Sequence, residues 1–282
     1  MDRMEHSIRE RAIVAGSPPR TTGRAHRTSR AAFGVILLGG VLLGASGAAA
    51  PPSQPPATPG GRPFSVQHNA ALPRDSVVRL GPGVYRVGSV TIDAQQRAVS
   101  MPGRVNMQSG AVELLACARY GKTHESVFAM DAEPYHIQVG LLLLGLEQTR
   151  KPLRFQGDPA QPTGDSVIVT VAWTDSAGKH VEVRGEDAVM DMRTHRPMPH
   201  TPWVFVGSRI HDGVFDAQVE GNIVTTYHDP ATIIDNPLDG GADDTVYVVN
   251  TALVPPVGTP VTLTLRPAGP PPEASRRQEK QP

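Results

Sequence analysis

Short apolar runs separated by turn-forming residues fill the chain from about residue 79 to residue 267. The runs are rich in β-branched and aromatic residues, which is typical of a strand-rich domain. The expected strands cover residues 83–92, 111–118, 166–173, 180–184, 203–207, 214–219, 222–227, 245–249 and 260–265. We therefore predict a β-rich α+β fold whose antiparallel sheets are arranged like a sandwich.

Two pairs of expected strands have the spacing of hairpins. Residues 214–219 and 222–227 flank the dipeptide Glu220-Gly221. A second pair flanks residues 175–178, a loop rich in turn formers. Such short connections favour antiparallel neighbours.

One helix is expected near residues 133–146. Asp131 is suited to cap it, and Pro134 is suited to its first turn. Residues 137–146 are apolar almost all round, which predicts a helix buried against the sheet. Ten apolar residues are too few to cross a membrane.

The N-terminal region has the order of an export signal. Residues 1–30 hold seven arginines against three acidic residues, and an uncharged segment follows at 31–50. The apolar centre at 33–43 has the length of a signal-peptide core, and the small residues at 46–50 suit cleavage near Ala50. The alternative is an uncleaved membrane anchor at 31–50. Both interpretations place the rest of the chain in a periplasmic or extracytoplasmic compartment, with membrane contact only through this segment.

Composition divides the remainder. Residues 51–78 begin with a Pro- and Gly-rich stretch that predicts a disordered linker, and residues 268–282 repeat this composition as a tail. Residues 79–267 are long enough for one domain with a sizeable core, although two β-rich lobes remain an open alternative. Without residues 1–30 the chain has 20 basic and 24 acidic residues, a formal charge of −4, which argues against a nucleic-acid partner.

Cys117 is the only cysteine, so the chain forms no internal disulfide and no cysteine cluster for zinc or iron–sulfur. We expect no cofactor. If residues 111–118 and 123–130 form a hairpin, Cys117 lies opposite His124, about 5 Å away at Cβ. Cys117 and His124, with Glu125, would then be candidates for a nucleophile and base or for metal ligands. The alternative is that Cys117 is a small buried apolar residue.

The hexapeptide at residues 121–126, Gly-Lys-Thr-His-Glu-Ser, places polar groups between two apolar runs. Polar residues crowded between core segments are typical of an edge or cleft. The candidate binding residues are Lys122, Thr123, His124, Glu125 and Ser126. Although Gly-Lys-Thr ends a phosphate-binding loop, Ala116 stands where such a loop needs its first glycine, so we expect no nucleotide.

An acidic loop offers a weak metal candidate. Asp235, Asp239 and Asp243 would supply oxygen ligands for calcium, but the loop lacks the EF-hand order and its closing glutamate. The alternative is a solvated turn before the strand at 245–249.

Several segments together resemble one family, the YdjY-domain proteins, which are exported bacterial proteins of no established activity. The segments that carry the resemblance are residues 112–117, 121–126, 141–145, 203–208 and 235–237. The resemblance covers about residues 79–267 and implies no catalytic residues. Some names in that family suggest a ferredoxin, but a single cysteine cannot ligate a four-iron cluster.

Two functions compete at this point, and a third, structural role in the envelope shares the features of the first. The first is a non-enzymatic module on a proline-rich tether that binds an envelope protein or cell-surface component near residues 122–125. The second is an enzyme or metal-binding protein that uses Cys117 and His124. We adopt the first because it needs no special chemistry.

Overall fold

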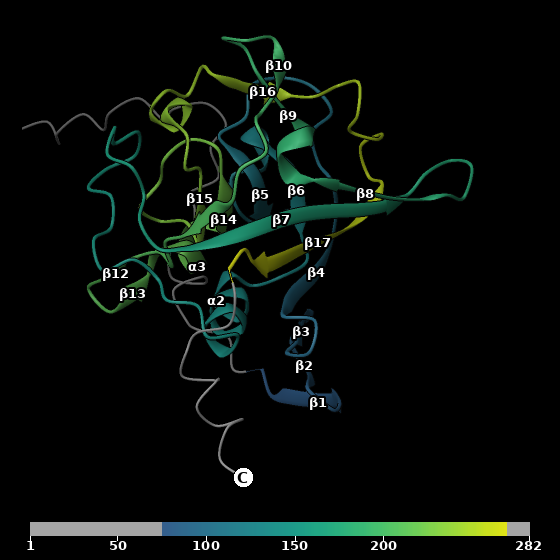
Figure 1. Cartoon of the computed structure of the whole chain (residues 1–282), viewed down its shortest axis with the longest axis vertical. Helices are drawn as coiled ribbons and strands as arrows, with labels where there is room; N and C mark the ends of the chain where they lie inside the picture. Colours follow the sequence, from purple (N-terminus) through teal and green to yellow (C-terminus); the bar gives the residue numbers. More distant parts are fainter. Residues whose placement is uncertain (1–74, 270–282) are drawn as a thin grey trace, which may run out of the picture. The chain divides into compact units, whose positions relative to one another are not determined.

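The computed structural model describes residues 75–269, and their central feature is a closed eight-stranded β-barrel (Figure 1). Each strand hydrogen-bonds to two neighbours in the ring, and the pairing of β4 with β6 closes it. In ring order the strands are β4 (Ala98–Val105), β17 (Pro260–Pro267), β7 (Asp165–Thr174), β11 (Trp203–Phe205), β15 (Ile234–Asp235), β14 (Asn222–Thr225), β5 (Leu114–Ala118) and β6 (Ser126–Met130).

The predicted sandwich is wrong, although the domain is β-rich as expected. A sandwich has two separate sheets, whereas here β4 pairs with β6 and leaves no free edge in the ring. Closure depends on Gly103, which lies opposite Met130. A Cβ at Gly103 would lie 2.7 Å from the Ala129 carbonyl oxygen, so only glycine lets β6 approach so closely.

Most ring neighbours are antiparallel, but β14 pairs with β15 in parallel and so does β5 with β6. The predicted hairpin around residues 119–122 is wrong, because β5 and β6 are parallel. In the parallel register Leu114 pairs with Ser126 and Cys117 pairs with Ala129. A short 3-10 helix, η1 (Thr123–Glu125), lies in the connection that returns the chain to the start of β6.

Further strands extend the ring. β1 (Val77–Gly81), β2 (Val84–Val87) and β3 (Val90–Asp93) form a meander beside β4, so an ordered strand begins at Val77, inside the predicted linker. β8 (His180–Arg184) pairs only with β7 among the described strands, and this hairpin confirms the one predicted around residues 175–178 (Figure 1). Small sheets and turns complete the described part: β9 (Val189–Asp191), β10 (Arg196–Pro197), β16 (Tyr247–Val249), β12 (Ile210–His211), β13 (Val214–Phe215), η2 (Gly185–Ala188) and η3 (Asp239–Ala242).

The predicted helix is present as α2 (Pro134–Leu143), with Pro134 in its first turn. Its buried face packs on the sheet, where a Cβ at Gly140 would lie 3.1 Å from Val99. The helix is not buried all round, because Leu143 is 62% exposed at its C-terminal end.

A second short helix, α3 (Asp216–Glu220), replaces the hairpin predicted over residues 214–227. Gly221 has a φ of 76° and ends this helix in the left-handed conformation. The Glu220-Gly221 dipeptide is therefore a helix C-terminus rather than a β-turn, because glycine serves both roles equally well.

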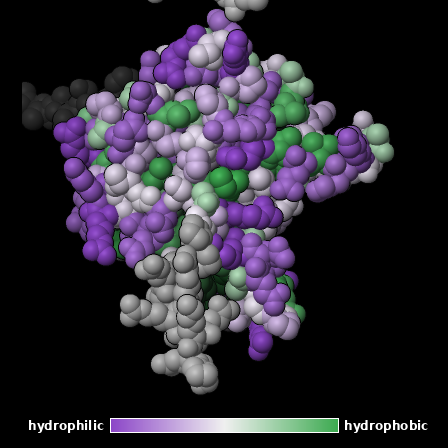
Figure 2. All heavy atoms as spheres, in the orientation of Figure 1, coloured by the Kyte–Doolittle hydropathy of each residue, from purple (hydrophilic) through white to green (hydrophobic). Residues whose placement is uncertain are grey.

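Alternate residues of each long strand fill the barrel. In β7, Val167, Val169, Val171 and Trp173 are buried and belong to the core, while the intervening residues are not. Trp203 and Phe205 of β11 join them as large, fully buried side chains. On the face shown in Figure 2 the apolar side chains form small separate patches among polar ones.

No helix among residues 75–269 is long and apolar enough to cross a membrane. The predicted signal peptide or anchor at 31–50, the start of the linker and most of the tail lie outside the described residues.

Candidate functional site

The candidate site exists because two glycines let distant segments touch. Gly121 follows β5, and Gly221 precedes β14. A Cβ at Gly221 would lie only 2.7 Å from the Gly121 Cα. The Gly221 carbonyl accepts a hydrogen bond of 2.7 Å from the Ala118 N–H. This contact brings the residue after Gly121 beside the residues that flank Gly221.

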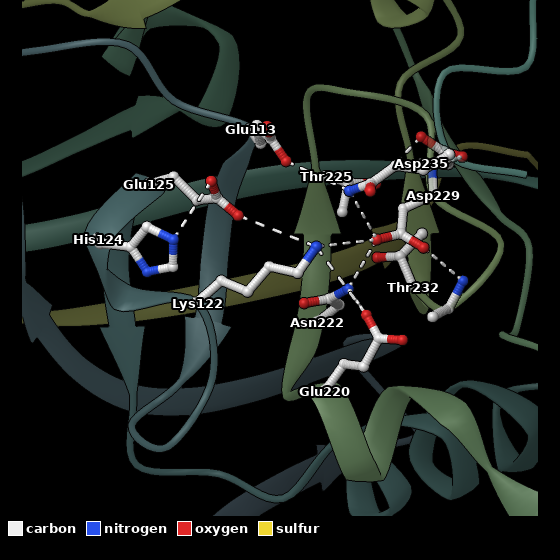
Figure 3. Close-up of polar contacts among 12 residues, drawn as sticks. Glu113, Lys122, His124, Glu125, Glu220, Asn222, Thr225, Asp229, Thr232 and Asp235 are labelled. Carbon is white, nitrogen blue, oxygen red and sulfur yellow. Dashed lines mark hydrogen bonds and ion pairs between the residues drawn. The ribbon is translucent and has the colours of Figure 1, made fainter. Parts of the chain in front are cut away.

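Lys122 lies at the centre of the resulting cluster (Figure 3). Its Nζ is 3.5 Å from Asp229 Oδ2. The same atom is 3.9 Å from Glu125 Oε1 and 3.9 Å from Glu220 Oε2. One ammonium group is therefore shared by three carboxylates that belong to three segments of the chain. We call this cluster the Lys122 site, and it comprises Glu113, Lys122, Glu125, Gln156, Glu220, Asn222 and Asp229.

Asn222 forms the buried floor of the Lys122 site. Its Nδ2 donates to Asp229 Oδ2 at 2.9 Å and to Glu220 Oε2 at 3.2 Å. Lys122 Nζ lies within 4 Å of the same two oxygens (Figure 3). The side chain is fully buried, and its Oδ1 has no hydrogen-bond partner within residues 75–269.

Glu113 and Gln156 extend the site along the start of β5. Gln156 Nε2 donates to Glu113 Oε2 at 3.3 Å and to Asp229 Oδ2 at 3.4 Å. Burial raises the pKa of Glu113, and the nearby Glu125 carboxylate raises it further. Burial likewise raises the pKa of Glu220, with a further contribution from Asp229. Burial is the main cause of both shifts, and neighbouring carboxylates add to them because the site has more carboxylates than ammonium groups.

The buried side chain of Asp235 holds the backbone of Asp229 in place. The Asp229 N–H donates to Asp235 Oδ2 at 3.3 Å, and Asp235 is fully buried on β15. The Thr225 hydroxyl donates to Asp235 Oδ1 at 3.0 Å. Burial holds the pKa of Asp235 well above its usual range. Asp235 thus supports the loop that carries Asp229, a role that its place in a predicted turn did not indicate.

The structure does not bring Cys117 and His124 together. Cys117 is fully buried within the parallel pair β5 and β6, whereas the His124 side chain is 78% exposed on η1. Burial raises the pKa of Cys117 to about 11, partly offset by a hydrogen bond with Ser126. The raised pKa disfavours the thiolate that a nucleophile or metal ligand requires.

Of the other hexapeptide residues, His124 is exposed and Ser126 is buried. His124 Nε2 lies 3.6 Å from Glu125 Oε2 at the rim of the Lys122 site. Asn106 Nδ2 donates to the carbonyl oxygens of Thr123 and Ser126 and so holds η1 in place. Ser126 is buried, and its hydroxyl donates to the Phe128 carbonyl. Lys122 and Glu125 are therefore the parts of the hexapeptide that enter the carboxylate cluster.

The three aspartates considered for calcium do not converge. Asp235 lies inside the barrel wall, Asp239 accepts a hydrogen bond from Gln161, and Asp243 caps the turn at Thr245. Within residues 75–269 no group of three or more His, Cys, Asp or Glu side chains is placed to hold a metal ion.

Sequence reasoning located the hexapeptide but missed most of its partners. The only local signal for Glu220 and Asn222 was Gly221 between them, which indicated a turn in the sequence. The residues missed are Glu113, Gln156, Glu220, Asn222 and Asp229.

A family model of the YdjY domain matches residues 90–266, more than half of the chain. The chain belongs to the YdjY-domain family. Searches of curated proteins and of solved structures found no match. The match spans β3 to β17 and includes every residue of the Lys122 site in the YdjY domain.

Proposed function

We propose that this YdjY domain is a non-enzymatic binding module and that the Lys122 site is its contact surface. The partner is an envelope protein or a cell-surface component. The observation that carries the proposal is the sharing of one lysine by three carboxylates at an accessible position. The Lys122 side chain is 24% exposed and Glu220 is 38% exposed, so a partner can reach both.

The chemistry of the site favours binding over catalysis. The buried thiol of Cys117 is not presented to a substrate, and the exposed imidazole of His124 has no thiol beside it. The polar groups are instead held by one another, and the Ala231 N–H also donates to Asp229 Oδ1. Such preorganised polar groups are what a recognition site requires.

The compartment in which the module acts follows from residues 1–50. Their basic start, apolar centre and small residues support export to the periplasm or the cell exterior, with either cleavage near Ala50 or anchoring by residues 31–50.

Site-specific photo-crosslinking in the native host tests the proposal. A photoreactive amino acid at position 124 stands at the rim of the Lys122 site, and His124 can be replaced because its side chain is largely exposed. Lys179, exposed on the β7–β8 loop, provides the matched control position. We expect a discrete adduct from position 124 and none from position 179. No adduct at 124, or the same adducts at both positions, would refute the proposal.

A further inference from the structure

We infer that the Lys122 site binds a cationic side chain, the guanidinium group of an arginine in a peptide segment. This inference rests on the proposed function and names the chemistry of the partner. It follows from the charge of the site, from an unsatisfied buried atom and from the surface around it.

The charge of the site is unbalanced. Three carboxylates, those of Glu125, Glu220 and Asp229, lie 3.5–3.9 Å from the single ammonium group of Lys122 (Figure 3). Glu113 is a fourth carboxylate in the site, and Gln156 donates to both Glu113 and Asp229. The distances from Nζ to Asp229, Glu125 and Glu220 are 3.5, 3.9 and 3.9 Å, so Lys122 makes no short ion pair with any of the three. Both Asp229 oxygens already accept hydrogen bonds, so a second cation would find its acceptors on Glu113, Glu125 and Glu220.

Asn222 supplies an independent observation. Its side chain is fully buried and is aimed into the cluster through its contacts with Glu220 and Asp229. Its Oδ1 lacks a partner among the described residues, and a buried carbonyl oxygen without a donor is costly. Lys122 lies beside this amide (Figure 3), and Oδ1 is the acceptor that an incoming N–H donor would satisfy.

Guanidinium fits these acceptors better than other cations. It offers five N–H donors in a planar fork that can contact two carboxylates and an amide oxygen at once. A divalent metal ion is disfavoured because the described acidic and histidine side chains form no ligand group of three. Phe155, next to Gln156 in the chain, is 50% exposed and already has the Arg154 guanidinium 5.1 Å from its ring centroid.

The surroundings favour a peptide over a lone small cation. Tyr227 lies beside Glu113, because its N–H donates to the Glu113 carbonyl oxygen at 3.0 Å. Burial raises the pKa of Tyr227, and the carboxylates of Asp244, Glu113, Asp243 and Asp229 raise it further. A peptide with more than one basic residue would complement this additional negative charge.

Titration of the purified full chain tests the inference. The probe is the peptide acetyl-Gly-Arg-Gly-amide, and its control is the same peptide with the uncharged isostere citrulline. Binding is followed by NMR shifts of the Asn222 side-chain amide up to ~10 mM peptide, since a single side chain gives only millimolar affinity. Spermidine is titrated in parallel as a cation that lacks the planar fork.

Three variants show where the peptide binds. Glu125→Gln and Glu220→Gln each remove one carboxylate of the Lys122 site with little change in volume. Glu182→Gln is the control, because Glu182 pairs with Arg266 at 3.7 Å on another part of the barrel. We expect each site variant to weaken arginine-peptide binding about tenfold and the control to leave it unchanged.

Arginine-dependent shifts at Asn222 that citrulline does not produce would support the inference. Equal binding of the two peptides, no binding of either, tighter binding of spermidine, or unchanged affinity in both site variants would overturn it. If the peptide test fails but a crosslinked adduct forms at position 124, the binding-module proposal still stands. The two proposals can therefore be refuted independently.

Discussion

Gly121 and Gly221 meet backbone to backbone, with room for no side chain between them. A Cβ at Gly221 would lie 2.7 Å from the Gly121 Cα, and one at Gly121 would lie 3.0 Å from the Glu220 carbonyl oxygen. The contact joins residues one hundred positions apart in the chain. It sets how far Lys122 stands from its carboxylates, so the geometry of the Lys122 site depends on two residues that carry no functional group.

Substitution of Gly221 by alanine should destabilise the protein through two effects. The residue has a φ of 76°, and its new Cβ would meet backbone atoms that cannot move aside. Gly178→Ala is the matched control, because Gly178 has a φ of 78° with nothing within 4 Å of the added Cβ. In urea unfolding we expect Gly221→Ala to lose about 1–3 kcal/mol more than the control. Equal losses would show that backbone strain alone matters and that the glycine contact does not.

The ion pairs of Lys122 should differ in strength according to burial. The Asp229 side chain is 6% exposed, while that of Glu125 is 21% exposed. Double-mutant cycles with Lys122→Met should give a coupling energy of about 1–3 kcal/mol with Asp229→Asn. The coupling with Glu125→Gln should be below about 1 kcal/mol. A larger coupling to Glu125 would contradict the burial argument.

Cys117 should react slowly with alkylating reagents in the folded protein. Burial raises its pKa to about 11, against ~8.5 for a free thiol. The thiolate fraction at neutral pH is therefore low, and the sulfur is also covered. We expect labelling by iodoacetamide at pH 8 only as fast as the protein unfolds, with no protection by zinc. Rapid labelling of the native protein, or zinc protection, would restore Cys117 as a candidate nucleophile or ligand.

His136 should make stability depend on pH. It is 2% exposed, and burial lowers its pKa, although Asp75 and Glu133 act in the opposite direction. Below about pH 6.5 the unfolded chain takes up a proton at this histidine before the folded protein does. The free energy of unfolding should therefore fall as pH decreases from about 6.5 toward the lowered pKa, by at most about 1.4 kcal/mol per pH unit.

Urea unfolding at pH 7.5 and 5.5 measures this effect. His136→Gln should lose less stability between the two pH values than the parent, because it removes the group that titrates. His180→Gln is the control, because His180 is exposed at the start of β8. An identical loss in all three proteins would exclude His136 as the cause.

The export prediction has a direct test in the mass of the protein. Expression of the full chain in a bacterial host should yield a product that lacks residues 1–50, recovered outside the cytoplasm, if the signal is cleaved. Replacing Leu37 and Leu38, in the centre of the apolar segment, by arginine should keep the full-length mass in the cytoplasm. Full-length protein in the membrane fraction of the unaltered chain would instead favour the anchor.

Local features of the fold were predictable from the sequence. The β7–β8 hairpin was expected because its turn residues and both strands are close together in the chain. The helix at Pro134–Leu143 was expected because proline and a long apolar run mark it without help from distant residues.

The closure of the barrel was not predictable, because it depends on distant pairings. β4 was missed as a strand because Pro102 and Gly103 lie within it, and both are unfavourable in strands. The parallel pairing of β5 with β6 was missed because adjacent parallel strands usually need a longer connection than residues 119–125. That error placed Cys117 opposite His124. Glu220 and Asp229, the distant partners of Lys122, come from about one hundred residues further on, where no sequence period marks them.

The position of β17 limits when the barrel can form. This strand, residues 260–267, lies between β4 and β7, and it bonds to both along most of its length. When every earlier strand has been synthesised, β4 and β7 still lack β17, the strand that pairs with both. Until about residue 267 emerges, the ring stays open and its core stays incomplete. Any process that requires an unfolded chain can therefore act until β17 has been made.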